Sequence, residues 1–360
     1  MRKSAAVCGL LAVVLILTAC GSLTSTSALR VPLVNQVALS NSFAGNSWRA
    51  SMVADFNVGA REAVKSGQIS SYEVVNADNS AGQQISQIED MIVGGYKAIV
   101  IDAASPTALN GVIAKACSVG IKVVVFDSLA SAPCAYKIAV DYRAYGSTQV
   151  DYIARRLHGT GNILNIRGIA GTSVDTDFVA GAQQAIKKHP GLHLIGNPYG
   201  QWTDSTTESA VAGLLPSLPT FSAVMSQGGE TYGAVEAIEH AGRKLPLLLF
   251  GNRGNSLHFW ASTLGPHYQT ISESSIPGMA DVALWAALML THGERIPKTI
   301  YVPLLRITNK TLPAWVAATP VSGVASLPLS RSFTERLIMQ NEHGKVPAVI
   351  DLLPDGKQVG

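Results

Sequence analysis

The sequence predicts an α/β protein in which parallel sheets are covered by helices on both faces. Short apolar segments of strand length alternate with segments whose apolar residues recur at helical spacing, over most of the chain. Residues 98–101 are apolar at every position and residues 121–126 almost so, which is typical of strands buried on both faces. The chain has 360 residues, and more strands are expected than one compact sheet holds, so we predict two domains.

The expected elements follow one another in regular order. The first strand lies within residues 34–39, and the helix after it starts at Trp48, with Ser47 as the predicted N-cap. The segment 140–145 is the expected crossing between the two domains. Further strands are expected at 71–77, 98–101, 121–126, 137–140, 162–166, 192–196, 223–226 and 247–250, and further helices at 83–94, 109–118, 145–157, 179–188, 206–215, 232–241 and 279–290.

The first residues have the features of a secretory signal. A positively charged start is followed by an apolar run over residues 5–17, which is too short to span a membrane comfortably. The sequence LTAC at 17–20 resembles the bacterial lipobox, which implies a signal peptide over 1–20 and a lipidated Cys20. An ordinary cleaved signal with an incidental Cys is the alternative. Residues 21–32 are predicted to be a flexible tether. We therefore expect an exported protein, held at the periplasmic or outer face of a membrane by its lipid.

Two cysteines are left once Cys8 leaves with the signal and Cys20 carries lipid. In an exported protein, Cys117 and Cys134 are expected to form a disulfide, and a free buried pair is the alternative. No His or Cys flanks either of them at ligand spacing, so we expect no metal site.

Composition and motifs exclude several functions. The net charge is +3, and Lys and Arg are scattered singly, so we expect no nucleic-acid partner. The glycine-rich segment 168–173 lacks both the GxGxxG spacing and the Lys-Ser/Thr of a phosphate-binding loop. No GxSxG or HExxH motif is present, and we predict neither an enzyme nor a cofactor.

The loop and helix start after the first strand are the strongest functional signal. Ligands of open α/β sheets bind at the carboxyl ends of strands, and here a polar loop over residues 40–47 leads into Trp48 and Arg49. The flat apolar indole of Trp48 can stack on the C–H faces of a sugar ring, and the planar guanidinium of Arg49 has five N–H donors for the hydroxyl groups at the ring's edge. Packing of Trp48 between helix and sheet, and a surface salt bridge of Arg49, are the alternatives.

Three segments in this order, VALSNSFAGNSWR at 37–49, VVVFDS at 123–128 and NIRGIAGTS at 165–173, resemble periplasmic sugar-binding proteins of the ribose/galactose type. These are the substrate-binding components of ABC importers, and the similarity runs from about Asn35 to Leu304. It implies two Rossmann-like lobes joined by three hinge crossings, with one sugar bound between them. The first lobe would comprise 33–140 and 274–302, and the second 141–273 and 303–360.

Carried over residue by residue, the resemblance implies a set of ligand-binding side chains. Asp102 and Asp127 end strands, where a helix cap or turn is the alternative explanation, and Trp202 would stack on the sugar ring from the second lobe. The full set is Ser42, Asn46, Trp48, Arg49, Asp102, Asp127, Trp202, Asn252 and Glu273.

The chain also departs from the family pattern. Ser128 and Phe178 stand where ribose binders have Arg, and Gly228 replaces an Asn. Arg49 and Arg253 add cations after two other strands, those expected within 34–39 and at 247–250. The Trp48-Arg49 pair resembles galactofuranose-type binders more than ribose binders. These changes alter which sugar hydroxyl is held.

The resemblance implies that the chain captures a monosaccharide or related polyol and delivers it to an ABC permease and its ATPase. We expect it to act as a monomer. A sensor co-receptor of the same fold is one alternative, and an exported sugar hydrolase using Asp102 and Asp127 is another. Residues 305–360 match the family poorly and are expected to wrap the second lobe or reach the permease. Trp260, Trp285 and Trp315 are expected to be packing residues.

Overall fold

The structure is a computed structural model, and it describes residues 35–359. The predictions of a signal peptide, of a lipidated Cys20 and of a tether concern residues outside this range. Within it, every helix is either too short or too polar to cross a membrane.

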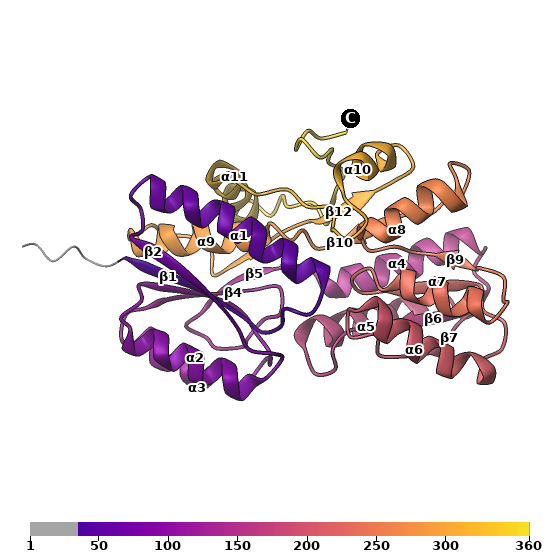
Figure 1. The fold of residues 1–360 in the computed structure, drawn as a ribbon, viewed down its shortest axis with the longest axis horizontal. Coiled ribbons are helices and arrows are strands. Elements are labelled where there is room, and N and C mark those ends of the chain that lie inside the picture. Colours follow the sequence, from indigo (N-terminus) through magenta and orange to yellow (C-terminus); the bar gives the residue numbers. More distant parts are fainter. Residues whose placement is uncertain (1–34, 360) are drawn as a thin grey trace, which may run out of the picture. The chain divides into compact units, whose positions relative to one another are not determined.

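Six parallel strands form the sheet of the first lobe, in the order β11-β5-β4-β3-β1-β2 (Figure 1). Its side chains alternate between two cores, because successive residues of a strand point to opposite faces. Leu39 and Val100 belong to one core, and Ala38 and Ile99 to the other. The strands are β1 (Gln36–Asn41), β2 (Ser71–Asn76), β3 (Ala98–Asp102), β4 (Lys122–Phe126), β5 (Tyr136–Ala139) and β11 (Thr299–Tyr301).

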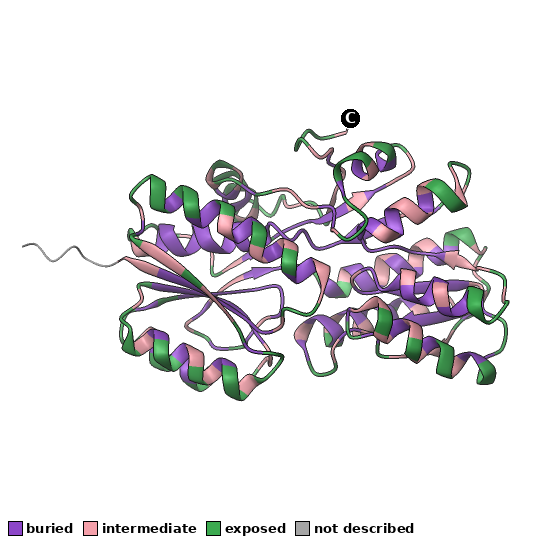
Figure 2. Cartoon of the chain, in the orientation of Figure 1, coloured by how far each residue is buried: buried purple, intermediate pink, exposed green. Residues whose placement is uncertain are grey.

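Helices cover both faces of this sheet, as the sequence predicts. Helices α1 (Ser47–Lys65) and α9 (Met279–Thr291) lie on one face, and α2 (Ala81–Val93) and α3 (Asn110–Ser118) on the other. Every residue of α9 except Thr291 is buried, and Figure 2 shows this helix almost wholly in purple. Helix α11 (Arg331–Glu342) packs on α9, which explains why α9 has no polar outer face.

The second lobe has a parallel sheet of four strands, in the order β7-β6-β8-β9. Its strands are β6 (Gly161–Ile166), β7 (Leu192–Gly196), β8 (Ala223–Ser226) and β9 (Leu247–Leu248). Its helices are α4 (Tyr142–Arg156), α5 (Ser173–Ile186), α6 (Asp204–Leu214), α7 (Thr231–His240), α8 (Gly254–Phe259) and α10 (Leu312–Ala318), with a 3₁₀ turn at Leu215–Ser217 and a π-helical turn at Trp260–Leu264. The two-lobed α/β architecture agrees with the predicted fold class.

A third, smaller sheet lies where the chain passes from lobe to lobe. It has the order β10-β12-β13, formed by β10 (Ser272–Ser274), β12 (Leu304–Ile307) and β13 (Val349–Ile350). The chain passes between the lobes near residues 140–141, 275–278 and 302–303, then again between α10 and α11 and between α11 and β13. The described residues thus contain five passages, whereas the family resemblance implies three.

The structure corrects the expected lobe boundaries. Residues 303–360 were expected to belong to the second lobe, yet α11 packs against α9 and β11 of the first. Helix α10, which packs against α8, lies on the second lobe, and the chain after α11 returns to it, where the carbonyl oxygen of Leu352 accepts the indole N–H of Trp315 at 2.8 Å. The short elements after residue 250 carry too little periodicity for sequence reasoning to find them.

The helix starts are corrected as well. Asn46, not Ser47, caps α1, because its side-chain oxygen accepts the backbone N–H of Arg49 at 2.8 Å. Helix α5 begins at Ser173 rather than at residue 179, with Thr172 as its N-cap, because its polar first turn hides the helical pattern. Trp260, Trp285 and Trp315 are fully buried, which confirms that they are packing residues.

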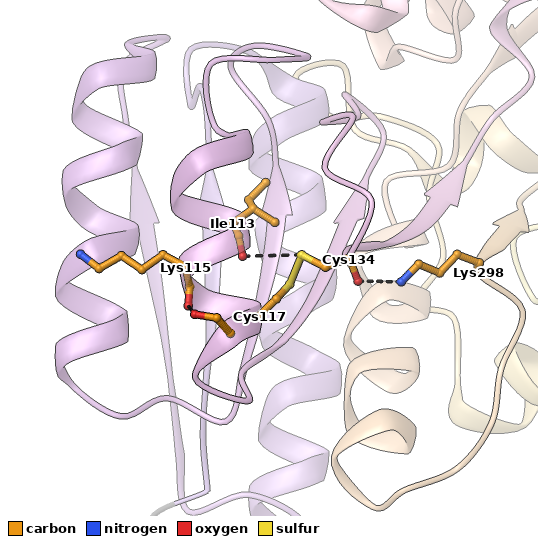
Figure 3. The surroundings of a disulfide bond; sticks show 6 residues. Ile113, Lys115, Cys117, Cys134 and Lys298 are labelled. Carbon is orange, nitrogen blue, oxygen red and sulfur yellow. Dashed lines mark hydrogen bonds between the residues drawn. A yellow bond between two sulfur atoms is a disulfide. The ribbon is translucent and has the colours of Figure 1, made fainter.

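Cys117 and Cys134 are joined by a disulfide in this structure (Figure 3). It connects the last turn of α3 to the loop that precedes β5, and the two Cα atoms are 6.4 Å apart. The carbonyl oxygen of Cys134 also accepts the Nζ of Lys298 at 2.6 Å, which ties this loop to the segment before β11.

Candidate functional site

A small cavity lies between the two lobes, at the carboxyl ends of their strands. The first lobe lines it with Asn46, Trp48, Arg49 and Asp127; the second lines it with Val174, Trp202, Gln227, Gly228 and Arg253; the first two passages add Tyr142, Ser274 and Ser275. Its volume is about 30 Å³, which is room for roughly two water molecules. A ligand as large as a sugar therefore enters only when the walls move apart.

The start of helix α1 supplies most of the first-lobe wall. Asn46 caps the helix, and Trp48 follows in its first turn with only 7% of its surface exposed. The Trp48 Nε1–H donates to the carbonyl oxygen of Ser275 at 2.9 Å, so the indole is held by the second passage. The guanidinium carbon of Arg49 lies 5.5 Å from the centre of this indole, within cation–π range.

Arg49 is a buried cation whose charge is balanced by carboxylates. Its Nη1 donates to the side-chain oxygen of Asn41 at 2.9 Å and to Asp102, and its Nη2 is 3.8 Å from Asp127. Burial lowers the pKa of Arg49, and the negative charge of Asp127 opposes this change. Because Asp102 is completely buried behind the guanidinium, it orients Arg49 and does not line the cavity.

Asp127 presents its carboxylate at the end of β4 because the backbone turns there, with a φ of 53°. Its Oδ1 accepts the hydroxyl of Tyr142, the first residue of α4, and Ser275 is a second hydrogen-bond partner. Burial raises the pKa of Asp127, while Arg49 and the two hydroxyls oppose the rise. The carboxylate is thus a hydrogen-bond acceptor whose position is fixed by Tyr142 from the first passage and Ser275 from the second.

The second-lobe wall is built around Trp202. Its backbone has a φ of 53°, a left-handed conformation that a bulky residue rarely adopts. Its indole lies directly over Gly168, where an added Cβ would be 2.1 Å from Nε1, so this approach requires glycine. The indole N–H also donates to the side-chain oxygen of Gln227 at 3.3 Å.

Arg253 reaches the cavity from the loop after β9 and fixes its neighbours. It is 4% exposed; its Nη2 donates to the carbonyl oxygen of Trp202 at 2.6 Å and its Nε to that of Gly228 at 3.0 Å. An added Cβ at Gly229 would be 2.7 Å from the Arg253 Cγ, so a residue without a side chain makes room for this cation. The remaining nitrogen, Nη1, is 3.8 Å from Asp204.

The structure brings five of the nine predicted ligand-binding residues to the cavity and leaves four away from it. The five are Asn46, Trp48, Arg49, Asp127 and Trp202. Ser42 does not line it: its N–H donates to the carbonyl oxygen of Asp102 at 3.1 Å, joining the ends of β1 and β3. Asp102 is also away from it, so Asp102 and Asp127 do not face a shared ligand space as a hydrolase pair would require.

Glu273 lies in β10 of the third sheet, hereafter the connecting sheet, and Asn252 is hydrogen-bonded to this sheet from the loop after β9; neither lines the cavity. The Asn252 amide donates to the carbonyl oxygen of Leu305 at 2.8 Å and accepts the hydroxyl of Ser272 at 2.7 Å. Glu273 is fully buried and pairs with Arg306 of the adjacent strand. The partners of both side chains therefore belong to this sheet and not to the cavity lining.

Sequence reasoning missed several lining residues. Gln227 directly follows β8, and a rule that selects the first polar residue after each parallel strand would have found it. Arg253, which the sequence indicated only as an additional cation, lies five residues after the end of β9. Tyr142 lies within the predicted crossing, for which the sequence predicts no ligand contact. Ser274 and Ser275 carry no comparable signal. Phe178 is fully buried and packs edge-on against Tyr145, so it is a core residue.

A larger hollow of about 580 Å³ lies elsewhere, between α11, the segment before it and the C-terminal residues. It contains none of the predicted ligand-binding residues, and no residue of the second-lobe sheet lines it. In the described part of the chain, no group of three or more His, Cys, Asp or Glu side chains is placed to hold a metal ion. The cavity between the lobes is therefore the candidate site.

Two α/β lobes with a polar, aromatic cavity between them define the class of periplasmic binding proteins. The chain matches the family model described as "Periplasmic binding protein domain" over residues 37–295, and it belongs to this family. The members of this family are solute-binding proteins.

The chain is also similar to individual solute-binding proteins. The ribose import binding protein RbsB of Bacillus subtilis is 24% identical over 239 residues, covering 66% of this chain and 77% of that protein. The structure of an ABC transporter solute-binding protein from Thermobispora bispora is 32% identical, with a TM-score of 0.82, and covers 87% of this chain and 97% of that one. A galactofuranose-binding protein shares the fold at 20% identity, with a TM-score of 0.70 and coverage of 79% and 98%.

Proposed function

We propose that this protein is the substrate-binding component of an ABC importer, and that it captures a monosaccharide or related polyol between its lobes. The observation that carries the proposal is the composition of the cavity. Trp48 of one lobe and Trp202 of the other line it together with the buried charged side chains of Arg49, Asp127 and Arg253. Relatives named as ribose import binding proteins, which are similar over two thirds of the chain, support this substrate class.

The chemistry of the cavity suits a neutral polyhydroxyl ligand. Indoles from both lobes cover C–H faces, Asp127 accepts hydroxyl protons, and Arg49 and Arg253 donate. The two guanidiniums do not create a strongly cationic site, because Asp102, Asp127 and Asp204 lie beside them. A ligand epimer that leaves one of these buried groups unpaired would lose about 1–3 kcal/mol.

Ligand binding would close the lobes because contacts from both walls exist together only in the closed form. This differential affinity is what shifts an open population toward a closed one. The closed, loaded protein would then be recognised by a membrane permease with its ATPase. We further propose that Cys20 carries the lipid anchor, that residues 21–32 tether the lobes to the membrane, and that the protein acts as a monomer.

The first experiment is a thermal-shift panel on the chain from Gly21 onward, with pentoses, hexoses, deoxy sugars and polyols. A ligand that binds only the folded state raises the melting temperature by mass action. A clear shift with one or two sugars is the expected result, followed by calorimetry to obtain Kd. A panel with no shift by any sugar or polyol would contradict the proposed substrate class.

Trp202→Ala tests the assignment of the site. We expect Kd to rise on the order of 30-fold, the effect of removing an aromatic side chain that dominates a buried contact, while the far-ultraviolet circular dichroism is retained. Tyr301→Ala removes a half-exposed aromatic of β11 outside the cavity and serves as the matched control. An equal Kd for wild type and Trp202→Ala would remove Trp202 from the site.

A further inference from the structure

The segment between α10 and α11, residues 319–330, connects the two lobes outside the three passages expected from the family. It leaves α10 on the second lobe and enters α11 on the first. This segment is hereafter called the strap. Figure 1 shows it passing above α1 on its way to α11.

The first half of the strap is fixed to the second lobe. Val324 forms an antiparallel bridge with Arg253, and the N–H of Ala325 donates to the carbonyl oxygen of Asn252 at 2.8 Å. The N–H of Gly254 donates to the carbonyl oxygen of Gly323, also at 2.8 Å. Val324 and Ala325 are buried, so the strap here is part of the packed structure.

The second half of the strap is fixed to the first lobe. The hydroxyl of Ser326 donates to Asp55 of α1 at 2.6 Å, and the N–H of Leu329 donates to Asp281 of α9 at 3.0 Å. The carbonyl oxygen of Leu329 accepts the indole N–H of Trp285 at 3.2 Å. Asp55 and Asp281 are both buried, so each of these carboxylates meets its partner away from bulk water.

The change of lobe occurs between two consecutive residues. Ala325 is bonded to the second lobe and Ser326 to the first, and consecutive Cα atoms are at most about 3.8 Å apart. The strap therefore has no spare length at this point. Asn252 and Asp55 cannot separate by more than a few ångströms unless one of the two hydrogen bonds breaks.

These attachment points lie next to both walls of the cavity. Asp55 is on α1, two turns after Trp48 and Arg49, and Asn252 immediately precedes Arg253. The strap thus joins the element that carries the first-lobe wall to the loop that carries part of the second-lobe wall.

We propose that the strap is an additional interlobe connection that positions the two cavity walls relative to each other and limits how far the lobes open, with the Ser326–Asp55 contact as its first-lobe anchor. This deepens the proposed function, since it concerns how the same cleft admits its ligand. Ser326 and Asp55 act through α1 and are positioning residues. A chain restricted in this way loses less conformational freedom on closing, and so spends less binding energy on closure.

The test measures interlobe distance without any ligand, so that it does not depend on the identity of the solute. Ser86→Cys on α2 and Ser209→Cys on α6, both chosen for labelling on the surfaces of opposite lobes, carry spin labels in the chain from Gly21 onward. In this form, Cys117 and Cys134 are joined in the disulfide, which leaves the introduced cysteines free to react.

Two variants and one control define the outcome. Insertion of Gly-Gly between Ala325 and Ser326 retains both anchors and adds up to about 7 Å of slack, and Ser326→Ala removes the hydroxyl anchor. Ser322→Ala changes an exposed serine of the same strap and is the control. We expect the label distance to lengthen by several ångströms, or its distribution to broaden, in the insertion and in Ser326→Ala, with Ser322→Ala matching the parent.

Identical distance distributions in the insertion variant and the parent would overturn the proposal. Should Ser326→Ala unfold, the insertion, which removes no side chain of the strap, decides the question alone. A sugar panel without any binding would leave this result unaffected, so failure of the strap inference and failure of the proposed substrate class are distinguishable.

Discussion

The buried carboxylate of Asp281 makes the stability of this protein depend on pH in an unusual direction. Asp281 is 1% exposed, and burial raises its pKa from 3.8 to about 8, although the Leu329 N–H stabilises the charged form. Between these values, the folded state holds a proton that the unfolded chain has released. An acid whose pKa is raised on folding stabilises the fold at low pH, and this stabilisation is lost as pH rises.

The magnitude follows from the size of the change in pKa. Each pH unit between the unfolded and folded pKa costs about 1.4 kcal/mol for one group, so raising pH from 5 to 8 should remove about 4 kcal/mol through Asp281. Asp55, whose pKa burial raises to about 6, adds a loss of the same sign up to that pH. Since domains of this kind are stable by about 5–15 kcal/mol, the effect is readily measurable.

The assay is urea unfolding, followed by circular dichroism at pH 5, 6, 7 and 8, with extrapolation to water. Asp281→Asn cannot ionise but keeps an oxygen that can accept the Leu329 N–H, so we expect most of the decline above pH 6 to disappear. Asp90→Asn, an exposed position on α2, is the matched control and should retain the parental decline. A parental free energy of unfolding that is constant or rises from pH 5 to 8, or an unchanged slope in Asp281→Asn, would refute the reasoning.

Three further changes have definite expected outcomes. Gly168→Ala places a Cβ 2.1 Å from the Trp202 indole nitrogen and should displace this side chain, so calorimetry should show weaker ligand binding by a folded protein, and equal binding would contradict the packing described. Cys117→Ser opens a disulfide across a separation of 17 residues and should cost about 3 kcal/mol in urea unfolding, as should Cys134→Ser; no loss would mean that the bridge does not form. Arg49→Met leaves a buried carboxylate without its partner and should destabilise the fold by about 3 kcal/mol or more while weakening ligand binding, and parental stability would show that this ion pair is not buried.

Much of the architecture was predictable because it depends on short-range patterns. The alternation of apolar strands and amphipathic helices predicted the two parallel sheets, since parallel strands must be covered on both faces. The position of Trp48 and Arg49 after the first strand predicted part of the cavity for the same reason. Asp127 and Trp202 required the family resemblance, because nothing local distinguishes them from a turn or a core residue.

The apolar and polar pattern of the sequence does not show which partners a side chain has once segments far apart in the chain pack together. Asn252 and Glu273 are expected at the ligand, but in the structure the Asn252 amide donates to Leu305 and one Glu273 carboxylate oxygen pairs with Arg306. Asp102 was expected to meet the solute and instead holds Arg49. A buried polar group goes to whichever partner the tertiary fold brings within hydrogen-bond distance, and this depends on strands that are distant in sequence.

The sequence by itself determined the fold class, the order of the main elements and the neighbourhood of the first-lobe wall, because helical and strand periodicity are local properties of the chain. Only the tertiary structure decided that Arg253, Gln227 and Tyr142 complete the cavity. It alone also showed that the C-terminal segment returns to the first lobe through the strap. Both outcomes depend on long-range packing: Gly229 leaves room for Arg253, and Asp55 meets Ser326 across 271 positions of the chain.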